Sequence, residues 1–143
     1  HRDLKCSNIL VDEADGIWTV KIADFGFARV KEANTTMTRC GTPSWIAPEI
    51  IRGEKYTEKA DIYSLGIIMW EVLTRRVPYE GLNFMGVSLQ VLDNQRPEIP
   101  DNCPAEFRKI MTRCWHPKAH KRPAIGEVVG FFKQLVGVSP FDV

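Results

Sequence analysis

The segment from Ala60 to Leu73 constrains the fold most strongly, because it is apolar almost all the way round a helix. Its large apolar side chains follow one another instead of forming a single stripe: Ile62, Leu65, Ile67, Ile68, Met69, Trp70, Val72 and Leu73. A helix without a polar face has to be buried. Asp61 lies inside it, and a carboxylate in such a place is costly unless it is paired or hydrogen-bonded. We therefore expect a buried helix in which Asp61 has partners.

Two β-type runs near the beginning of the chain predict a hairpin. Ile9–Val11 and the run 18–22 are β-branched or apolar, and the turn pair Asp15-Gly16 lies between them. An Asp-Gly pair between such runs is a strong hairpin signal. Asn8 and Asp24 flank the two runs, so we expect them at the open end of the hairpin, close together in space.

Three further helices are expected in the second half of the chain. One runs from Asn83 to Leu92 with Asn83 as its cap, one follows Pro104, and one follows Ala124. Ala124 lacks a capping oxygen, so that helix should be slightly weakened. The apolar stripes that mark the last two helices are Phe107, Ile110, Met111 and Cys114, and then Ile125, Val128, Val129 and Phe132. The protein is therefore expected to be mainly α with a small β-hairpin.

The polar residues around the hairpin suit phosphoryl transfer. Such a reaction requires charge neutralisation and an in-line arrangement of oxygens, with little covalent chemistry. Asp3 can accept the proton of an attacking hydroxyl, and Lys5 can offset charge on the transferred phosphate. Asn8 and Asp24 offer the hard oxygen ligands that magnesium prefers. These residue types in this order predict a site for a metal-bound phosphate.

Several motifs, in order along the chain, resemble those of one enzyme family. His1–Asn8 and Asp24-Phe25-Gly26 resemble the catalytic loop and the metal-binding motif of eukaryotic protein kinases. Gly41–Ile46 and Ala47-Pro48-Glu49 resemble the substrate-docking loop and the end of the activation segment. The run from Asp61 to Gly66 resembles the central helix of the family, and Cys114–Pro117 with Lys121-Arg122-Pro123 resembles its closing segment.

The resemblance implies an incomplete α+β fold, the C-terminal lobe of a protein kinase. Residues 1–135 would form the partial kinase domain and 136–143 a C-terminal tail. The Gly-rich loop, the strand lysine and the helix glutamate of the family lie upstream of such a segment and do not occur here. We therefore expect a fragment that transfers no phosphate by itself and exposes apolar surface.

The resemblance also assigns roles to residues other than the proton acceptor and the metal ligands. Leu10 would form the floor beneath adenine, although core packing also fits it, and Thr42 would hydrogen-bond Asp3 and Lys5. Asp61 would hold the backbone of the catalytic loop. An ion pair between Glu49 and Arg122 would tie the activation segment to the helical base.

A regulated loop is expected between Phe27 and Cys40, where periodicity disappears and polar residues accumulate. In the family, an arginine at the place of Arg2 pairs with a phosphate on this loop. Thr35, Thr36 and Thr38 are the candidate acceptors. The alternative is that these threonines are solvated loop residues without a regulatory role.

The implied function is protein serine/threonine kinase activity that uses ATP and Mg²⁺. Lys5 and the Gly41-Thr42 pair resemble serine/threonine kinases, whereas Cys114-Trp115 resembles tyrosine kinases. The combination resembles the tyrosine-kinase-like group, so protein substrates with serine or threonine acceptors are expected, and dual or tyrosine specificity stays open. A pseudokinase scaffold is the other alternative, although Asp3, Lys5, Asn8 and Asp24 are all intact.

Composition argues against other classes of partner. The net charge of +1 gives no basic excess of the kind that a nucleic-acid surface needs. No apolar run is long enough to span a bilayer, so no membrane contact is expected from this segment. The four cysteines, Cys6, Cys40, Cys103 and Cys114, form no close pair. A kinase is expected in the cytoplasm, where thiols stay reduced.

Overall fold

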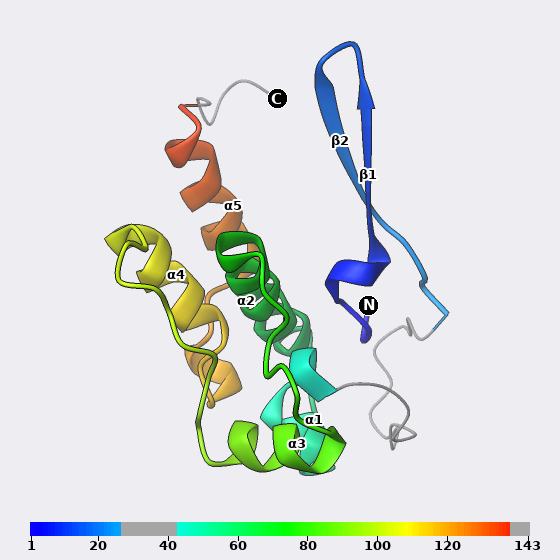
Figure 1. Ribbon diagram of the computed structural model, residues 1–143, viewed down its shortest axis with the longest axis vertical. Coiled ribbons are helices and arrows are strands. Elements are labelled where there is room, and N and C mark those ends of the chain that lie inside the picture. Colours follow the sequence, from blue (N-terminus) through cyan, green and yellow to red (C-terminus); the bar gives the residue numbers. More distant parts are fainter. Residues whose placement is uncertain (27–42, 138–143) are drawn as a thin grey trace.

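The structure is a computed structural model that describes residues 1–26 and 43–137, a set of helices beside one β-hairpin (Figure 1). The strands are β1 (Ile9–Ala14) and β2 (Ile17–Ile22), and the helices are α1 (Pro48–Ile51), α2 (Lys59–Thr74), α3 (Phe84–Leu92), α4 (Ala105–Cys114) and α5 (Ile125–Leu135). Short 3-10 turns are η1 (Cys6–Asn8), η2 (Pro43–Trp45) and η3 (Ala119–Lys121). Within the described residues, no helix combines the length and the apolar character that crossing a bilayer requires. The expected mainly α fold with one hairpin is confirmed.

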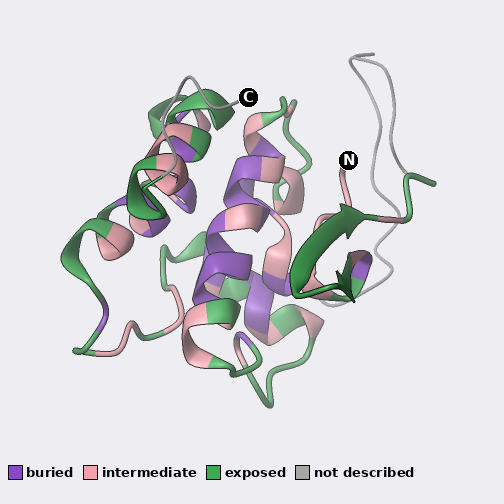
Figure 2. Cartoon of the chain, turned by 90° about the horizontal axis from the view of Figure 1, so that it is seen from above, coloured by how far each residue is buried: buried purple, intermediate pink, exposed green. Residues whose placement is uncertain are grey.

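Helix α2 lies at the centre of the helical part, as its apolar sequence predicted. It contacts α4, η2 and η3, and Figure 2 shows most of its length as buried. Tyr63 and Ile67 have no exposed surface at all. Burial does not extend to the last turn, where Val72 is 58% exposed. The expectation of burial throughout 60–73 is therefore wrong at this end, since the buried residues of the helix extend only as far as Trp70.

The hairpin forms with the predicted turn. β1 and β2 are antiparallel, with Ile9 opposite Ile22 and Ala14 opposite Ile17. Asp15 and Gly16 have φ of 54° and 76°, which is the geometry of a type I′ turn. The ribbon stands beside the helices and is almost wholly exposed (Figures 1 and 2). Its exposed apolar side chains are Leu10, Val11, Ile17, Trp18, Val20 and Ile22, so the expectation of exposed apolar surface is confirmed.

The three later helices begin close to the predicted residues. Asn83 caps α3, with its side-chain oxygen accepting from the Gly86 N–H at 2.9 Å. Pro104 takes the capping position of α4 and so precedes the first turn by one residue. Ala124 contributes no capping side chain to α5, but the Glu127 carboxylate accepts from the Ala124 N–H at 3.1 Å. This bond satisfies one donor at the helix start and reduces the weakness that alanine causes there.

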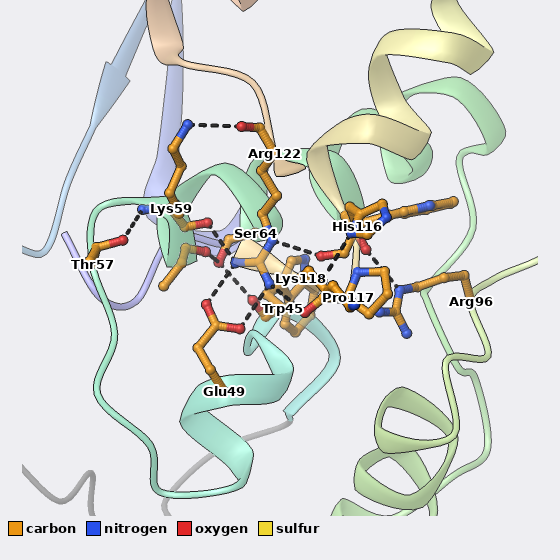
Figure 3. Close-up of polar contacts among 12 residues, drawn as sticks. Trp45, Glu49, Thr57, Lys59, Ser64, Arg96, His116, Pro117, Lys118 and Arg122 are labelled. Carbon is orange, nitrogen blue, oxygen red and sulfur yellow. Dashed lines mark hydrogen bonds and ion pairs between the residues drawn. The ribbon is translucent and has the colours of Figure 1, made fainter. Parts of the chain in front are cut away.

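The expected ion pair between Glu49 and Arg122 is confirmed, and it is buried (Figure 3). The Arg122 guanidinium donates to both carboxylate oxygens of Glu49, at 2.7 and 2.8 Å. It also donates to the carbonyl oxygens of His116, at 2.8 Å, and Lys59, at 2.9 Å. The pair therefore joins α1 to the beginning of α2 and to the segment between α4 and α5.

Replacing Gly66 by alanine should destabilise the fold. A Cβ atom there would lie 2.9 Å from the Trp115 nitrogen and 3.0 Å from the Cys114 Cβ, so α2 would have to move away. We expect a loss of about 1–3 kcal/mol in the free energy of unfolding, from overpacking. Gly130→Ala in α5 is the control, since no atom lies within 4 Å of its Cβ position. If urea unfolding gives the two variants the same free energy of unfolding, the close approach of Gly66 to Cys114 and Trp115 is contradicted.

Removing one partner of the buried ion pair should lower the free energy of unfolding by more than the Gly66 substitution does. Glu49→Ala leaves the Arg122 guanidinium buried without its carboxylate, and we expect a loss of about 3–5 kcal/mol. Glu54→Ala removes the exposed partner of Arg52, whose ion pair is 2.8 Å long, and should cost less than about 1 kcal/mol. The free energies of unfolding are compared by urea unfolding. If Glu49→Ala loses no more stability than Glu54→Ala, burial does not increase the contribution of the ion pair to stability.

Candidate functional site

Asp61 connects the buried helix to residues 1–8, which we call the opening loop. Its two carboxylate oxygens accept from the His1 amino nitrogen, at 2.8 Å, and from the Arg2 N–H, at 3.0 Å. The expectation that this acid has hydrogen-bond partners is confirmed. The rigid helix therefore fixes the backbone from which the candidate catalytic side chains extend.

Asp3, Lys5 and Asn8 form one hydrogen-bonded cluster in the opening loop. The Lys5 ammonium lies 3.1 Å from a carboxylate oxygen of Asp3. The Asn8 side-chain nitrogen donates to the Asp3 carbonyl at 2.8 Å and to its carboxylate at 3.2 Å. Asn8 is buried, and its amide oxygen takes part in none of the hydrogen bonds among the described residues. That oxygen is therefore available to a ligand.

Asp24 lies at the same end of the hairpin as Asn8. The Ala23 N–H donates to the Asn8 carbonyl at 2.8 Å, which continues the pairing of the two strands by one step. Asp24 then takes a left-handed conformation, with φ of 61°, and one of its carboxylate oxygens accepts from the Gly26 N–H at 3.4 Å. A Cβ on Gly26 would lie 3.3 Å from this oxygen, so glycine leaves room for the carboxylate.

His1 and Phe25 pack against each other between the opening loop and the end of β2. Their rings make an edge-to-face contact with 4.7 Å between centroids. The His1 Nε2 atom is 2.9 Å from the Ala23 carbonyl oxygen. This ring contact joins the two segments that carry Asp3 and Asp24. The role of His1 was missed, since nothing in its local pattern indicates a partner more than twenty residues away.

Arg2 has a partner other than the phosphate that the resemblance implies. Its backbone is left-handed, with φ of 73°, and its guanidinium lies 5.4 Å from the centre of the Tyr56 ring. Such a cation–π contact is a moderate attraction that a phosphate can replace. The candidate acceptors Thr35, Thr36 and Thr38, and also Thr42, lie outside the described residues, so their roles stay predictions.

Leu10 projects from an exposed strand and is itself 57% exposed. Core packing within the described part of the chain therefore does not account for it. Its place two residues after Asn8 brings an apolar surface close to the candidate metal ligands. The role beneath adenine stays a prediction.

Helix α2 also fixes the η2 turn, through two polar side chains that sequence reasoning missed. The Ser64 hydroxyl donates to the Trp45 carbonyl at 2.7 Å, and the Trp45 ring N–H donates to the Glu71 carboxylate at 2.7 Å. Ser64 and Glu71 are polar residues seven positions apart in a mostly apolar helix, hence on the same side two turns apart. That spacing is the signal by which they could have been found.

The site combines a fixed carboxylate, an ammonium and two further oxygen ligands. The described residues contain no cluster of three or more histidine, cysteine, aspartate or glutamate side chains that could hold a metal by themselves. An amide oxygen and a carboxylate at one end of a hairpin instead suit a hard cation that takes its remaining ligands from a substrate or from water. The arrangement is therefore suited to a metal-bound phosphate.

Comparisons with known proteins agree with this chemistry. A family model described as protein tyrosine and serine/threonine kinase matches residues 1–132. The protein R831 of Acanthamoeba polyphaga mimivirus, named as a serine/threonine-protein kinase/receptor, is 64% identical over 129 residues, which cover 90% of this chain and 8% of that protein. The protein drkD of Dictyostelium discoideum, named as a serine/threonine-protein kinase, is 43% identical over 136 residues, which cover 95% of this chain and 10% of that protein.

The chain thus spans about a tenth or less of the length of these relatives. The family model covers nearly all of the chain, and it includes every candidate residue named above. The chain belongs to the protein tyrosine and serine/threonine kinase family.

Proposed function

We propose that this chain is the catalytic half of a protein serine/threonine kinase, which transfers the γ-phosphoryl group of ATP to a hydroxyl of a protein substrate. The observation that carries the proposal is the cluster of Asp3, Lys5 and Asn8 at the same end of the hairpin as Asp24. Family membership supports it, as do the names of the relatives.

Asp3 acts as the proton acceptor for the substrate hydroxyl. Its carboxylate is oriented by the Asn8 amide, and one of its oxygens lies 3.1 Å from the Lys5 ammonium. Lys5 is also close enough to the base to offset charge on the group in transfer. The two side chains therefore serve the same reacting centre from one loop.

Asn8 and Asp24 fit the role of ligands for the magnesium ion that accompanies ATP. Their free amide oxygen and carboxylate are the ligand types that this ion prefers, and the left-handed backbone at Asp24 sets the direction of its carboxylate. When bound, Mg²⁺ neutralises phosphate charge and aligns the γ-phosphoryl group. Leu10, exposed beside these ligands, provides an apolar contact for adenine.

The chain corresponds to the C-terminal lobe, with residues 1–135 as a partial kinase domain and 136–143 as a tail. The exposed apolar ribbon supports this assignment, because a second lobe would cover it. The sequence contains no Gly-rich phosphate loop, so the 143-residue chain alone should transfer no phosphate. The complete protein would act in the cytoplasm.

Specificity for serine and threonine is supported by Lys5 in the Asp3-Leu4-Lys5 run and by the names of the relatives. Thr42, next to the η2 turn, would hydrogen-bond Asp3 and Lys5 and so help to orient the acceptor hydroxyl. An assay with matched serine, threonine and tyrosine peptides distinguishes this specificity from the tyrosine and dual alternatives.

Asp3→Asn in the full-length protein should abolish most turnover while ATP binding persists. The base acts on the hydroxyl and not on the nucleotide, so we expect kcat to fall by about 10²–10⁴-fold with little change in the Kd for ATP. The measurements are a phosphoryl-transfer assay with Mg²⁺ and a separate nucleotide-binding titration.

Asp24→Ala is the matched variant, and it should weaken binding of the magnesium nucleotide instead. Equal activity of either variant and wild type would refute the corresponding role. A wild-type protein that binds ATP but phosphorylates nothing would favour the pseudokinase scaffold.

Phosphate transfer by the isolated 143-residue chain would refute its assignment as an incomplete domain.

A further inference from the structure

Arg96 lies in the segment that follows α3, and it packs against the buried helix α2. Its guanidinium lies over the ring of Tyr63, 5.1 Å from the ring centre. Its Nε atom donates to the Trp115 carbonyl at 3.2 Å, and its Nη1 atom donates to the carbonyls of Val91, at 3.2 Å, and Gln95, at 2.8 Å. Arg96 is therefore fixed in position by two of its three nitrogen atoms.

Two buried polar atoms at this contact have no hydrogen-bond partner among the residues that the structure describes. They are the Nη2 atom of Arg96 and the hydroxyl oxygen of Tyr63, a residue without exposed surface. Arg96 also takes part in none of the ion pairs of the described chain. Buried polar atoms almost always bind another protein group or an ordered water, because an unpaired one is costly. Two such atoms on stacked side chains therefore indicate a common partner.

Tyr79 brings a third polar group to the same place. Its hydroxyl donates to the Gln95 carbonyl at 3.2 Å, and this carbonyl oxygen is also the one that accepts from the Nη1 atom of Arg96. The Tyr79 hydroxyl and the Arg96 guanidinium thus meet at one atom. Since the proton of the hydroxyl is used in this bond, the Tyr79 oxygen remains available as an acceptor.

The Tyr63 hydroxyl remains protonated and can therefore donate. Burial is the main cause that raises the pKa of Tyr63, the neighbouring Tyr79 adds to it, and the charge of Arg96 opposes it. The place between the three side chains is therefore bordered by two donors, Arg96 Nη2 and the Tyr63 hydroxyl, and by one acceptor, the Tyr79 oxygen.

We propose that a buried water molecule binds between Arg96, Tyr63 and Tyr79. Its oxygen accepts from Arg96 Nη2 and from the Tyr63 hydroxyl, and one of its hydrogens is donated to the Tyr79 oxygen. About three hydrogen bonds are typical of an internal water. An anion would suit the two donors, but it would face the lone pairs of the Tyr79 and Gln95 oxygens. Water offers both a donor and an acceptor, so it matches all three groups.

The water connects α2 to the segments on both sides of α3. Tyr63 belongs to α2, Tyr79 precedes α3, and Arg96 follows it. Helix α3 in turn contacts α1 and the η2 turn. A polar bridge at this position therefore stabilises the place of α3 on the buried helix. It does not depend on the proposed kinase function.

The direct test is a crystal structure of the full-length protein at a resolution that shows ordered water. We expect a density peak within hydrogen-bond distance of Arg96 Nη2 and of the hydroxyl oxygens of Tyr63 and Tyr79. Well-defined density for the three side chains without such a peak would overturn the inference. A halide at this place, identified by anomalous scattering from crystals grown in bromide, would also overturn it.

Tyr63→Phe gives a second test, in which the sign of the effect decides. The change removes only the hydroxyl, so the water loses one partner and the bridge weakens. The backbone amides of residues 93–95 donate back to carbonyls of α3, and we expect them to exchange several-fold faster with solvent. The measurement is hydrogen-exchange mass spectrometry on the full-length protein. If the hydroxyl had no partner, its removal would relieve an unpaired buried group, and exchange that is unchanged or slower would overturn the inference.

Tyr56→Phe is the matched control, because it removes the same group from a ring that lies against Arg2 instead of Arg96. Exchange at residues 93–95 should stay at the wild-type rate in this variant. Equal acceleration in both variants would indicate a general loosening of the protein, and it would overturn the specific role of the Tyr63 hydroxyl.

Discussion

The burial of α2 is the constraint on which the rest of the structure depends. The helix is apolar along most of its length, and its few polar side chains face other segments. Asp61 binds the opening loop, Ser64 and Glu71 bind the η2 turn, and the Lys59 ammonium donates to the carbonyls of Arg122 and Pro123, at 2.8 and 2.9 Å. Ser64 is buried and the other three side chains are partly buried, and a polar group that is removed from water is costly without a partner. The helix therefore stabilises the core and positions the site through the same side chains.

The buried pair of Glu49 and Arg122 extends this arrangement to the far side of the helix. Both Arg122 and Arg96 place a guanidinium over the Tyr63 ring, 5.2 and 5.1 Å from its centre. Arg122 is thus held by a carboxylate, by backbone carbonyls and by an aromatic face. The residues that end the kinase-like activation segment and those near α5 are in this way joined to one helix.

The elements that the sequence predicted correctly depend on local signals. The Asp15-Gly16 turn, the Asn83 cap and the apolar run of α2 are each encoded within a few residues, and each is present. The features that were missed depend on contacts between distant segments. The spacing of Ser64 and Glu71 marks a polar side of α2, but it does not identify Trp45 as the partner, and no local pattern identifies Tyr56 as the partner of Arg2. For the same reason the exposure of Val72 could not be read from hydrophobicity alone.

The hairpin has a consequence for handling this segment in isolation. Among the residues that the structure describes, each strand of this ribbon has one unpaired edge, and the edges lie next to exposed side chains such as Leu10, Trp18 and Val20. Free backbone donors and acceptors beside apolar surface are a template for intermolecular β-sheet extension. We therefore expect this stretch to be where the isolated segment associates with itself, and co-expression with a polypeptide that shields it to reduce that association.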